Sequence, residues 1–427
     1  MTTLQSENHL HLYGCLTAKS LFKHSTERAK KFKPRFDWFL AEYKKITGVS
    51  INPDLWWKPA DGYETFKQHF LCSNVSMFEI FQAKFNLLIA LFPPDPEDMT
   101  LPKEVFETHR PEGGYKEYRT FLPLYLSADQ RALYLKKLIE TAKEHETEAY
   151  HPRLAISFSR QNSESWDSYR FLFDFIEKNP ELRPWITGID FCASERGHPP
   201  KTKKDLFNAI NSDYQQGLHD LNILYHVGEM WQDIALHSAA RWCIEASELG
   251  VQRLGHALAL GMNPENLRER KIQENVLETN DHLAWLRRHR FELHENGFTT
   301  KDYEWLTDYV DSNTSGDLVT WHYRDDLIYQ TQNFQNALLK IIKNFDPVVE
   351  TCPTSNIRIG NLKKPSFHPI PRFLDHRLRV TISTDDPGIF DITLSGEERI
   401  VGELFKVSNE QLKSSEALSR SLLEPRG

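Results

Sequence analysis

The sequence has few cysteines and no spacing that would pair them. Five are spread over 427 residues with no Cys-x-x-Cys motif: Cys15, Cys72, Cys192, Cys243 and Cys352. Disulfide frameworks normally place an even number of cysteines close together in a short secreted chain. This pattern therefore argues against such a framework, and we expect reduced thiols in a cytoplasmic protein.

Basic blocks and long apolar runs are also missing. The chain has 52 Lys and Arg against 60 Asp and Glu, a formal net charge of −8, which argues against nucleic acid as the main ligand. No run approaches the roughly 18 apolar residues of a membrane span. Histidines interrupt the first apolar stretch, so we expect no secretory leader. The chain is expected to bind neither nucleic acid nor membrane.

The chain contains enough apolar residues for a large hydrophobic core, since 40% of its residues are hydrophobic and 12% are aromatic. Eight short apolar segments predict buried strands, at about 8–12, 115–121, 153–158, 185–191, 221–226, 251–255, 347–352 and 378–384. Such runs are typical of parallel strands covered on both faces. Helical spacing lies between them, as at Phe78, Phe81, Phe85 and Leu88. The alternation predicts a (β/α)₈ TIM barrel.

One connection is longer than a βα unit requires. About 90 residues separate the sixth predicted strand from the seventh, whereas about 30 would suffice. The surplus, about 261–335, is rich in charged and aromatic residues. Its helix-like stretches are 264–278, 281–290, 301–311 and the start of 325–345. We expect one metal-dependent hydrolase barrel domain over 1–427 with this helical insertion between strands 6 and 7. The insertion could cover the substrate, form a homo-oligomer contact or be passive.

Histidines and carboxylates follow the ends of several predicted strands. They occur as His9-Leu-His11, His226-Val-Gly-Glu229, Gly255-His256 and Ser383-Thr-Asp385-Asp386-Pro387. His9 and His11 lie two residues apart, so both side chains point to one face of a strand. A barrel brings strand ends together whatever their separation in sequence. Three imidazoles and one carboxylate are suitable donors for a catalytic zinc ion.

Each fragment alone has a simpler interpretation. The His-x-His pair could be two solvated histidines near a chain end, and Asp-Asp-Pro is good turn chemistry. His256 alone is typical of a core histidine. Glu229, three residues after His226, suits a proton shuttle but could equally lie on the surface. Asp385 and Asp386 are consecutive in the sequence, so their side chains should point in different directions. One can then bind metal while the other contacts the substrate.

Taken together and in this order, the fragments resemble the motifs of the adenosine deaminase family of the metal-dependent amidohydrolases, which includes adenosine and AMP deaminases. Further matches are Phe81-Gln-Ala-Lys-Phe85, Tyr115-Lys-Glu-Tyr-Arg119, Gly188-Ile-Asp190 and Cys352-Pro-Thr-Ser-Asn356. The resemblance covers about residues 7–260 and 345–410, so the insertion falls outside it.

The resemblance implies a hydrolase of purine nucleotide metabolism that converts an adenine nucleoside or nucleoside monophosphate, ribo or deoxy, to the inosine form plus ammonia. It assigns one zinc ion per protomer to His9, His11, His226 and Asp385. It assigns catalysis to Glu229, which would protonate the purine ring, and to His256 and Asp385, which would orient the attacking water. The implied substrate contacts are Tyr13, Phe81, Phe85, Ala193 and Asp386.

Two of those positions depart from the family's pattern. Tyr13 stands where nucleoside deaminases commonly carry an acid that bonds the sugar 5′-hydroxyl. A carboxylate there would repel a phosphate, so Tyr13 favours a 5′-phosphorylated substrate. Ala193 stands where a glycine amide usually bonds the purine, and a backbone donor survives that change.

Two other functions fit less well. A different amidohydrolase, acting on another amine or amide, would use the same metal, but Asp386 and the 81–85 segment count against it. A barrel-based assembly protein without catalysis would use the insertion for contacts. The complete set of metal donors together with Glu229 and His256 counts against that second alternative.

Overall fold

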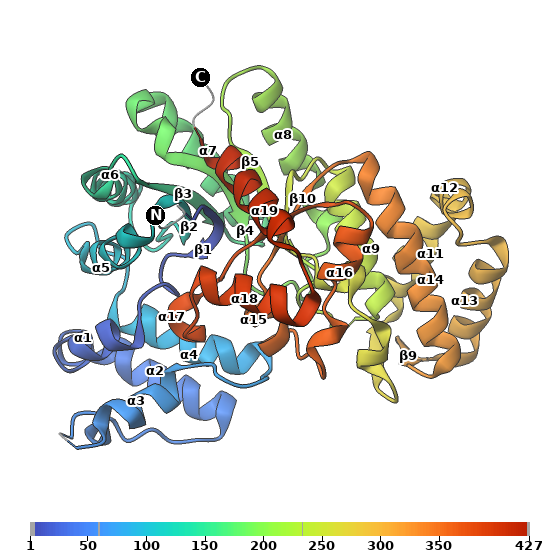
Figure 1. The fold of residues 1–427 in the computed structure, drawn as a ribbon, viewed down its shortest axis with the longest axis horizontal. Coiled ribbons are helices and arrows are strands. Elements are labelled where there is room, and N and C mark those ends of the chain that lie inside the picture. The colour runs from blue at the N-terminus through green and yellow to red at the C-terminus, as the bar shows by residue number, and fades with distance from the viewer. Residues whose placement is uncertain (1–4, 59, 233, 425–427) are drawn as a thin grey trace.

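A computed structural model describes residues 5–58, 60–232 and 234–424. Eight parallel strands form one sheet (Figure 1), in the order β1 (Glu7–His11), β2 (Gly114–Phe121), β3 (Tyr150–Phe158), β4 (Ile186–Phe191), β5 (Asn222–Val227), β6 (Arg253–His256), β10 (Val348–Thr351) and β11 (Arg379–Ile382). A bridge between Leu10 and Asp385 joins the two ends of the sheet. The eight strands that the sequence predicts are confirmed, and so is the barrel.

Helices cover the outside of the sheet. They are α6 (Ala128–His145), α7 (Asn162–Lys178), α8 (Lys204–Gln215), α9 (Leu236–Glu248), α14 (Asp325–Ile341) and α16 (Ile370–Asp375). The C-terminal helix α19 (Asn409–Leu423) packs across β11, β1 and β2. Because the strands are covered on both faces, they read as apolar runs. None of the described helices is long and apolar enough to cross a membrane.

A block of helices fills the connection from β1 to β2. It comprises α1 (Ala18–Lys31), α2 (Lys33–Thr47), α3 (Gly62–Phe70), α4 (Phe78–Leu91) and α5 (Thr100–His109). The Thr17 hydroxyl caps α1 by accepting from the amide of Ser20. In α4, Phe81 and Leu88 are buried on one face, and Ala83 and Ala90 are buried on the opposite face. This helix therefore packs on several sides, and it forms one wall of the cavity described below.

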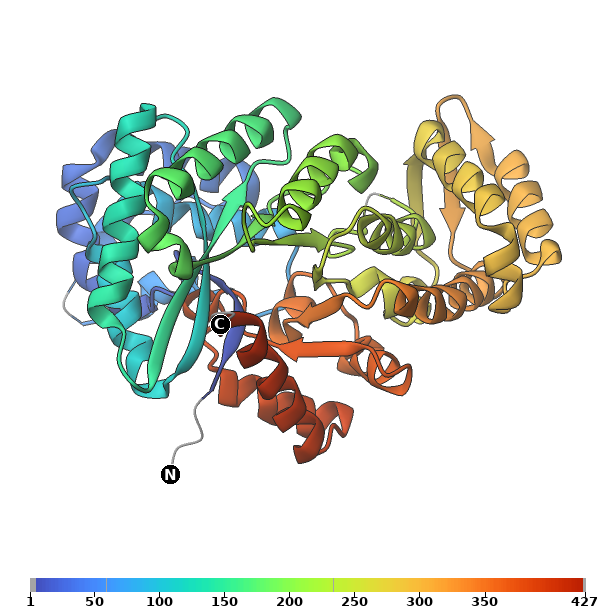
Figure 2. The same ribbon diagram turned by 90° about the horizontal axis from the view of Figure 1, so that it is seen from above.

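The insertion between β6 and β10 projects from the barrel, at the opposite end of the molecule from α1–α3 (Figure 2). It contains β7 (Lys271–Asn275), α11 (Val276–Arg288), α12 (Arg290–Glu295), α13 (Thr300–Asn313), β8 (Thr314–Ser315) and β9 (Leu318–His322). Its strands form a small antiparallel sheet in the order β7-β9-β8. The helix expected over 264–278 is wrong, because Ile272 and Glu274 are buried between exposed neighbours. That two-residue period is the period of a strand.

A buried carboxylate anchors the insertion to the barrel. Glu274 is fully buried and accepts hydrogen bonds from the amide of Ala235 at 2.8 Å, the Thr279 hydroxyl at 2.7 Å and the Trp321 indole at 3.2 Å. Ala235 directly precedes α9, which belongs to the barrel. The contacts of Glu274 therefore tie the antiparallel sheet to the helix beneath it.

Candidate active site

Four predicted metal donors meet at the carboxyl end of the barrel strands. His9 and His11 come from β1, His226 from β5, and Asp385 from the turn after β11. Nε2 of His226 lies 3.1 Å from Nε2 of His9 and 3.2 Å from Nε2 of His11. Asp385 Oδ1 lies 3.5 Å and 3.3 Å from the same atoms of His9 and His11. One donor atom from each residue lies within 4.8 Å of all the others.

Hydrogen bonds orient these donors. Nδ1 of His9 lies 3.1 Å from Glu350, and Nδ1 of His226 lies 3.1 Å from Asp190. Protons on both Nδ1 atoms would leave the Nε2 lone pairs facing each other, an unfavourable arrangement unless a cation lies between them. Two nitrogens held at about 2.0–2.1 Å by a tetrahedral zinc would be about 3.3 Å apart. The observed separations are close to that value.

Asp385 provides a second test of whether the residues fit a metal. Its Oδ2 accepts a hydrogen bond from the Ser355 hydroxyl at 2.7 Å. Its Oδ1 is buried and has no hydrogen-bond partner among the described residues. Buried oxygens are nearly always paired, so this atom is an unused acceptor aimed at the histidines. The four residues therefore fit a metal ion.

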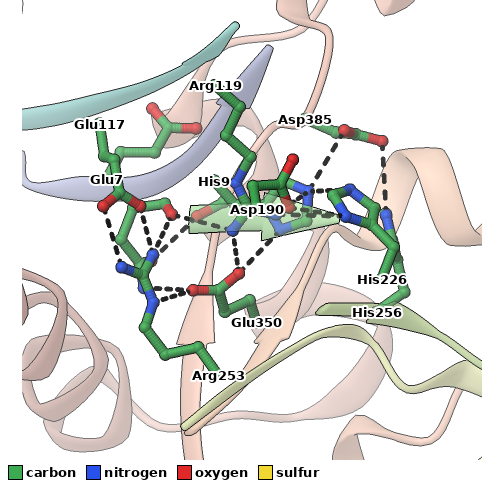
Figure 3. A network of polar contacts seen from close by, with 12 residues as sticks. Glu7, His9, Glu117, Arg119, Asp190, His226, Arg253, His256, Glu350 and Asp385 are labelled. Carbon is green, nitrogen blue, oxygen red and sulfur yellow. Dashed lines mark hydrogen bonds and ion pairs between the residues drawn. The ribbon is translucent and has the colours of Figure 1, made fainter. Parts of the chain in front are cut away.

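A network of buried charges lies around the donors (Figure 3). Arg119 is paired with Asp190 and Glu350, and its Nη1 also lies 3.3 Å from Nε2 of His9. Arg253 is paired with Glu350 and Glu117. Removing one partner of such a buried pair typically costs about 3–5 kcal/mol. Sequence reasoning missed this network, although a charged residue within an apolar strand was an available signal for Asp190, Arg253 and Glu350.

His256 is held in one orientation beside the donors. Its Nδ1 lies 2.8 Å from the Asn356 side-chain oxygen, and the amide nitrogen of Asn356 donates to Thr351. A proton on Nδ1 leaves Nε2 free to face the cavity. That atom lies 3.5 Å from Glu229 and 3.9 Å from Asp385. The structure thus brings His256 and Glu229 to the metal donors.

Two carboxyl groups at this site have raised pKa values. Burial, followed by the charges of Asp385 and Glu195, raises the pKa of Glu229 to about 8. Burial and the neighbouring charge of Asp385 raise the pKa of Asp386 well above its usual value. Carboxyl groups that keep their proton near neutral pH can donate hydrogen bonds or act as acids.

A cavity of about 190 Å³ opens over these groups. Its floor is formed by His11, His226, Glu229, His256, Asp385 and Asp386. Its remaining walls are largely apolar and are formed by Phe78, Phe81, Gln82, Phe85, Ile89, Phe121, Cys192, Ala193 and Ile359. Four of the five predicted substrate contacts line the cavity. None of the described residues of the 261–335 insertion does so, which gives no support to a lid.

The fifth predicted contact, Tyr13, is not among the residues that line the cavity. Burial, followed by the neighbouring side chain of Tyr134, raises its pKa well above the usual value. Ala193 does line the cavity, with a left-handed backbone φ of 68°. Glycine is favoured in that conformation, so the glycine that is usual at this position in the family would fit this backbone better than alanine does.

Comparisons with known proteins agree with this arrangement. Residues 322–423 match the family model for adenosine deaminase. The chain is 24% identical over 258 residues to an adenosine deaminase of Plasmodium gallinaceum, covering 54% of this chain and 67% of that protein. It is 40% identical over 68 residues to an aminodeoxyfutalosine deaminase of Acidothermus cellulolyticus, covering 16% of this chain. That second match spans only 19% of the relative's length.

Solved structures share the fold over nearly the whole chain. An adenine deaminase from Arthrobacter aurescens has a TM-score of 0.54 at 15% identity, covering 98% of this chain and 93% of that one. The Arabidopsis N6-mAMP deaminase MAPDA has a TM-score of 0.57 at 16% identity, covering 99% of this chain and 93% of that one. At these identities the likeness shows the architecture alone.

Proposed function

The chain belongs to the adenosine deaminase family, and we propose on that basis that it is a zinc-dependent hydrolytic deaminase of adenine nucleosides. The observation that carries the proposal is the convergence of four metal donors beside Glu229, a buried acid with a raised pKa. Hydrolytic removal of an amino group needs a nucleophilic water and a proton donor. This site offers a place for each.

The metal would be held by His9, His11, His226 and Asp385. Imidazole nitrogens with one carboxylate suit zinc. When bound, the metal supplies Lewis acidity that makes a water molecule nucleophilic near neutral pH. Asp385 and His256 would orient that water through Oδ2 and Nε2, the atoms that face each other at 3.9 Å.

The remaining residues act on the base. Glu229 donates its proton to the ring nitrogen beside the amino-bearing carbon, which weakens the aromaticity of the ring. Water then attacks that carbon; one of its protons passes to the amino group, which leaves as ammonia, and the other returns to Glu229, so that a 6-oxopurine remains. Asp386 contacts a second ring nitrogen, and burial beside Asp385 raises the pKa of its carboxyl group above the usual value. The backbone amide of Ala193 can donate a hydrogen bond to the edge of the base.

The cavity walls favour an unphosphorylated substrate. The described residues that line the cavity include no lysine or arginine, and the acidic ones are Glu229, Asp385 and Asp386. Arg196, on the loop that carries Ala193, is exposed and lies 3.7 Å from Glu79. Tyr13, the residue expected to contact a phosphate, is not among the residues that line the cavity.

Ammonia release from adenosine, deoxyadenosine, AMP and dAMP, measured side by side, tests this proposal. We expect kcat/KM for each nucleoside to exceed that of its monophosphate at least about 10-fold, the factor that corresponds to 1.4 kcal/mol. A preference for AMP and dAMP would contradict the expectation that the sugar of the substrate carries no 5′-phosphate. Release of ammonia from none of the four would contradict the function itself.

Gly14 allows Asp386 to reach the cavity, and its replacement gives a further prediction. A Cβ atom at Gly14 would lie 1.6 Å from Asp386 Oδ1 and 2.7 Å from its Cβ. Gly14→Ala must therefore displace Asp386, and we expect kcat/KM to fall about 10–100-fold, as for a lost hydrogen bond to an ionisable group. Gly402→Ala is the control, because its nearest neighbour would be 3.8 Å away. Unchanged kcat/KM in Gly14→Ala would remove Asp386 from the substrate contacts.

A further inference from the structure

A second buried glutamate holds the loop that carries Glu229. Glu195 lies on the loop after β4 and is 1% exposed. Its carboxylate accepts hydrogen bonds from three consecutive backbone amides: Gly228 at 2.8 Å, Glu229 at 2.9 Å and Met230 at 2.9 Å. Sequence reasoning assigned no role to Glu195, because no local pattern relates it to residues more than 30 positions away.

The turn that Glu195 binds is tightly constrained. Gly228 has a backbone φ of 72°, and a Cβ there would lie 3.0 Å from Cys243 Sγ. Its carbonyl oxygen accepts from the amide of Ala259 at 2.9 Å. With Glu195 in place, the amides of the turn are paired although the turn is buried. Without it, those amides would have to find water or move, and Glu229 would move with them.

A buried arginine fixes the loop from the other side. Arg160 donates to the carbonyl oxygens of Cys192 at 3.1 Å, Ala193 at 3.2 Å and His226 at 2.6 Å. It thus links the end of β4 to the end of β5. Arg160 and Glu195 carry opposite charges on neighbouring loops and interact favourably. The position of Ala193 is therefore coupled to the position of the turn that carries Glu229.

We propose that Glu195 is a positioning residue that holds the proton donor Glu229 within reach of the base. This inference rests on the proposed function, in which Glu229 is the acid. Glu195 is absent from both the metal donors and the residues that line the cavity, so it reaches the reaction through Glu229, chiefly by holding the backbone of residues 228–230. A displacement of about 1 Å at a reacting group can cost about 10²-fold in rate.

Two substitutions and a matched control test the proposal. Glu195→Ala removes both acceptor oxygens and with them all three hydrogen bonds, and we expect kcat to fall about 100-fold with KM and metal content near wild type. Glu195→Gln keeps one oxygen acceptor and should lose less. Glu274→Gln is the control, because Glu274 is equally buried and also accepts a backbone amide, but it lies in the insertion. We expect wild-type kcat from that control.

A double-substitution cycle separates positioning from general stability. If Glu195 acts through Glu229, then adding Glu195→Ala to Glu229→Gln should cost no more than about 3-fold further, because coupled residues are not additive. A full repeat of the 100-fold loss would overturn the proposal. If Glu195→Ala does not fold, Glu195→Gln replaces it in the cycle. Loss of metal together with activity in Glu195→Gln would make the residue structural and would also overturn the proposal.

Amide hydrogen exchange provides a readout independent of activity. The amides of residues 228–230 should exchange faster in Glu195→Ala than in wild type and be unchanged in Glu274→Gln. Unchanged exchange in Glu195→Ala would contradict the proposed contacts. A wild-type protein that releases no ammonia would instead contradict the proposed function, while the exchange result would still report on the turn.

Discussion

Replacing Glu229 with glutamine is expected to lower kcat by about 10²–10⁴ while leaving the metal bound, since that is the usual contribution of general acid catalysis. Glutamine keeps the size of the side chain and can donate a hydrogen bond, but it cannot transfer a proton. Glu229 is not one of the four metal donors, so metal content should stay at about one ion per chain. Steady-state kinetics and metal analysis of the same preparation check both expectations.

The pH dependence of turnover sharpens this prediction. Because the pKa of Glu229 is raised to about 8, the group is protonated at neutral pH and loses its proton as pH rises. The wild-type kcat should therefore fall on the alkaline side, and the residual kcat of Glu229→Gln should lack that decrease. If Glu229→Gln strips the metal, or retains wild-type turnover, Glu229 is not the acid.

Replacing His226 with alanine is expected to abolish both metal binding and activity. His226 Nε2 lies 3.1 Å from Nε2 of His9 and 3.2 Å from Nε2 of His11. The substitution therefore removes one of the three nitrogen donors. The fold should survive, because Asp190 keeps its contacts with Arg119 at 3.2 Å and Ser157 at 2.8 Å. Metal analysis and circular dichroism of the purified variant test this.

A histidine outside the site provides the control for this experiment. His24 contacts Glu104 at 3.0 Å and is not one of the metal donors. His24→Ala should keep its metal and its turnover. A folded His226→Ala protein with full metal content would contradict the assignment of the donors.

The barrel and the donor set were predictable because each depends on local patterns. A short apolar run in the sequence is typical of a parallel strand that is covered on both faces. Each strand could therefore be recognised from its own residues. His9 and His11 share a strand, whereas His226 and Asp385 each follow one. Strand ends of a barrel meet at one face, so convergence followed once the strands were known.

The other features of the site depend on contacts between distant residues, which the spacing of residues in the sequence does not reveal. Glu350 orients His9 across more than 300 residues, and Glu195 binds a turn on another strand. The sequence predicts a helix where β7 lies, because an alternation over only five residues is too short to distinguish a strand. The motif predicts that Tyr13 contacts the substrate, whereas in the structure Tyr13 is not among the residues that line the cavity.

The central claim, metal-dependent deamination, is tested most directly by one titration. The protein is stripped with a chelator, zinc is added back in steps, and ammonia release from adenosine is measured at each step. The donor set predicts no activity in the stripped protein and full recovery at about one zinc per chain. Undiminished ammonia release from metal-free protein would contradict the account.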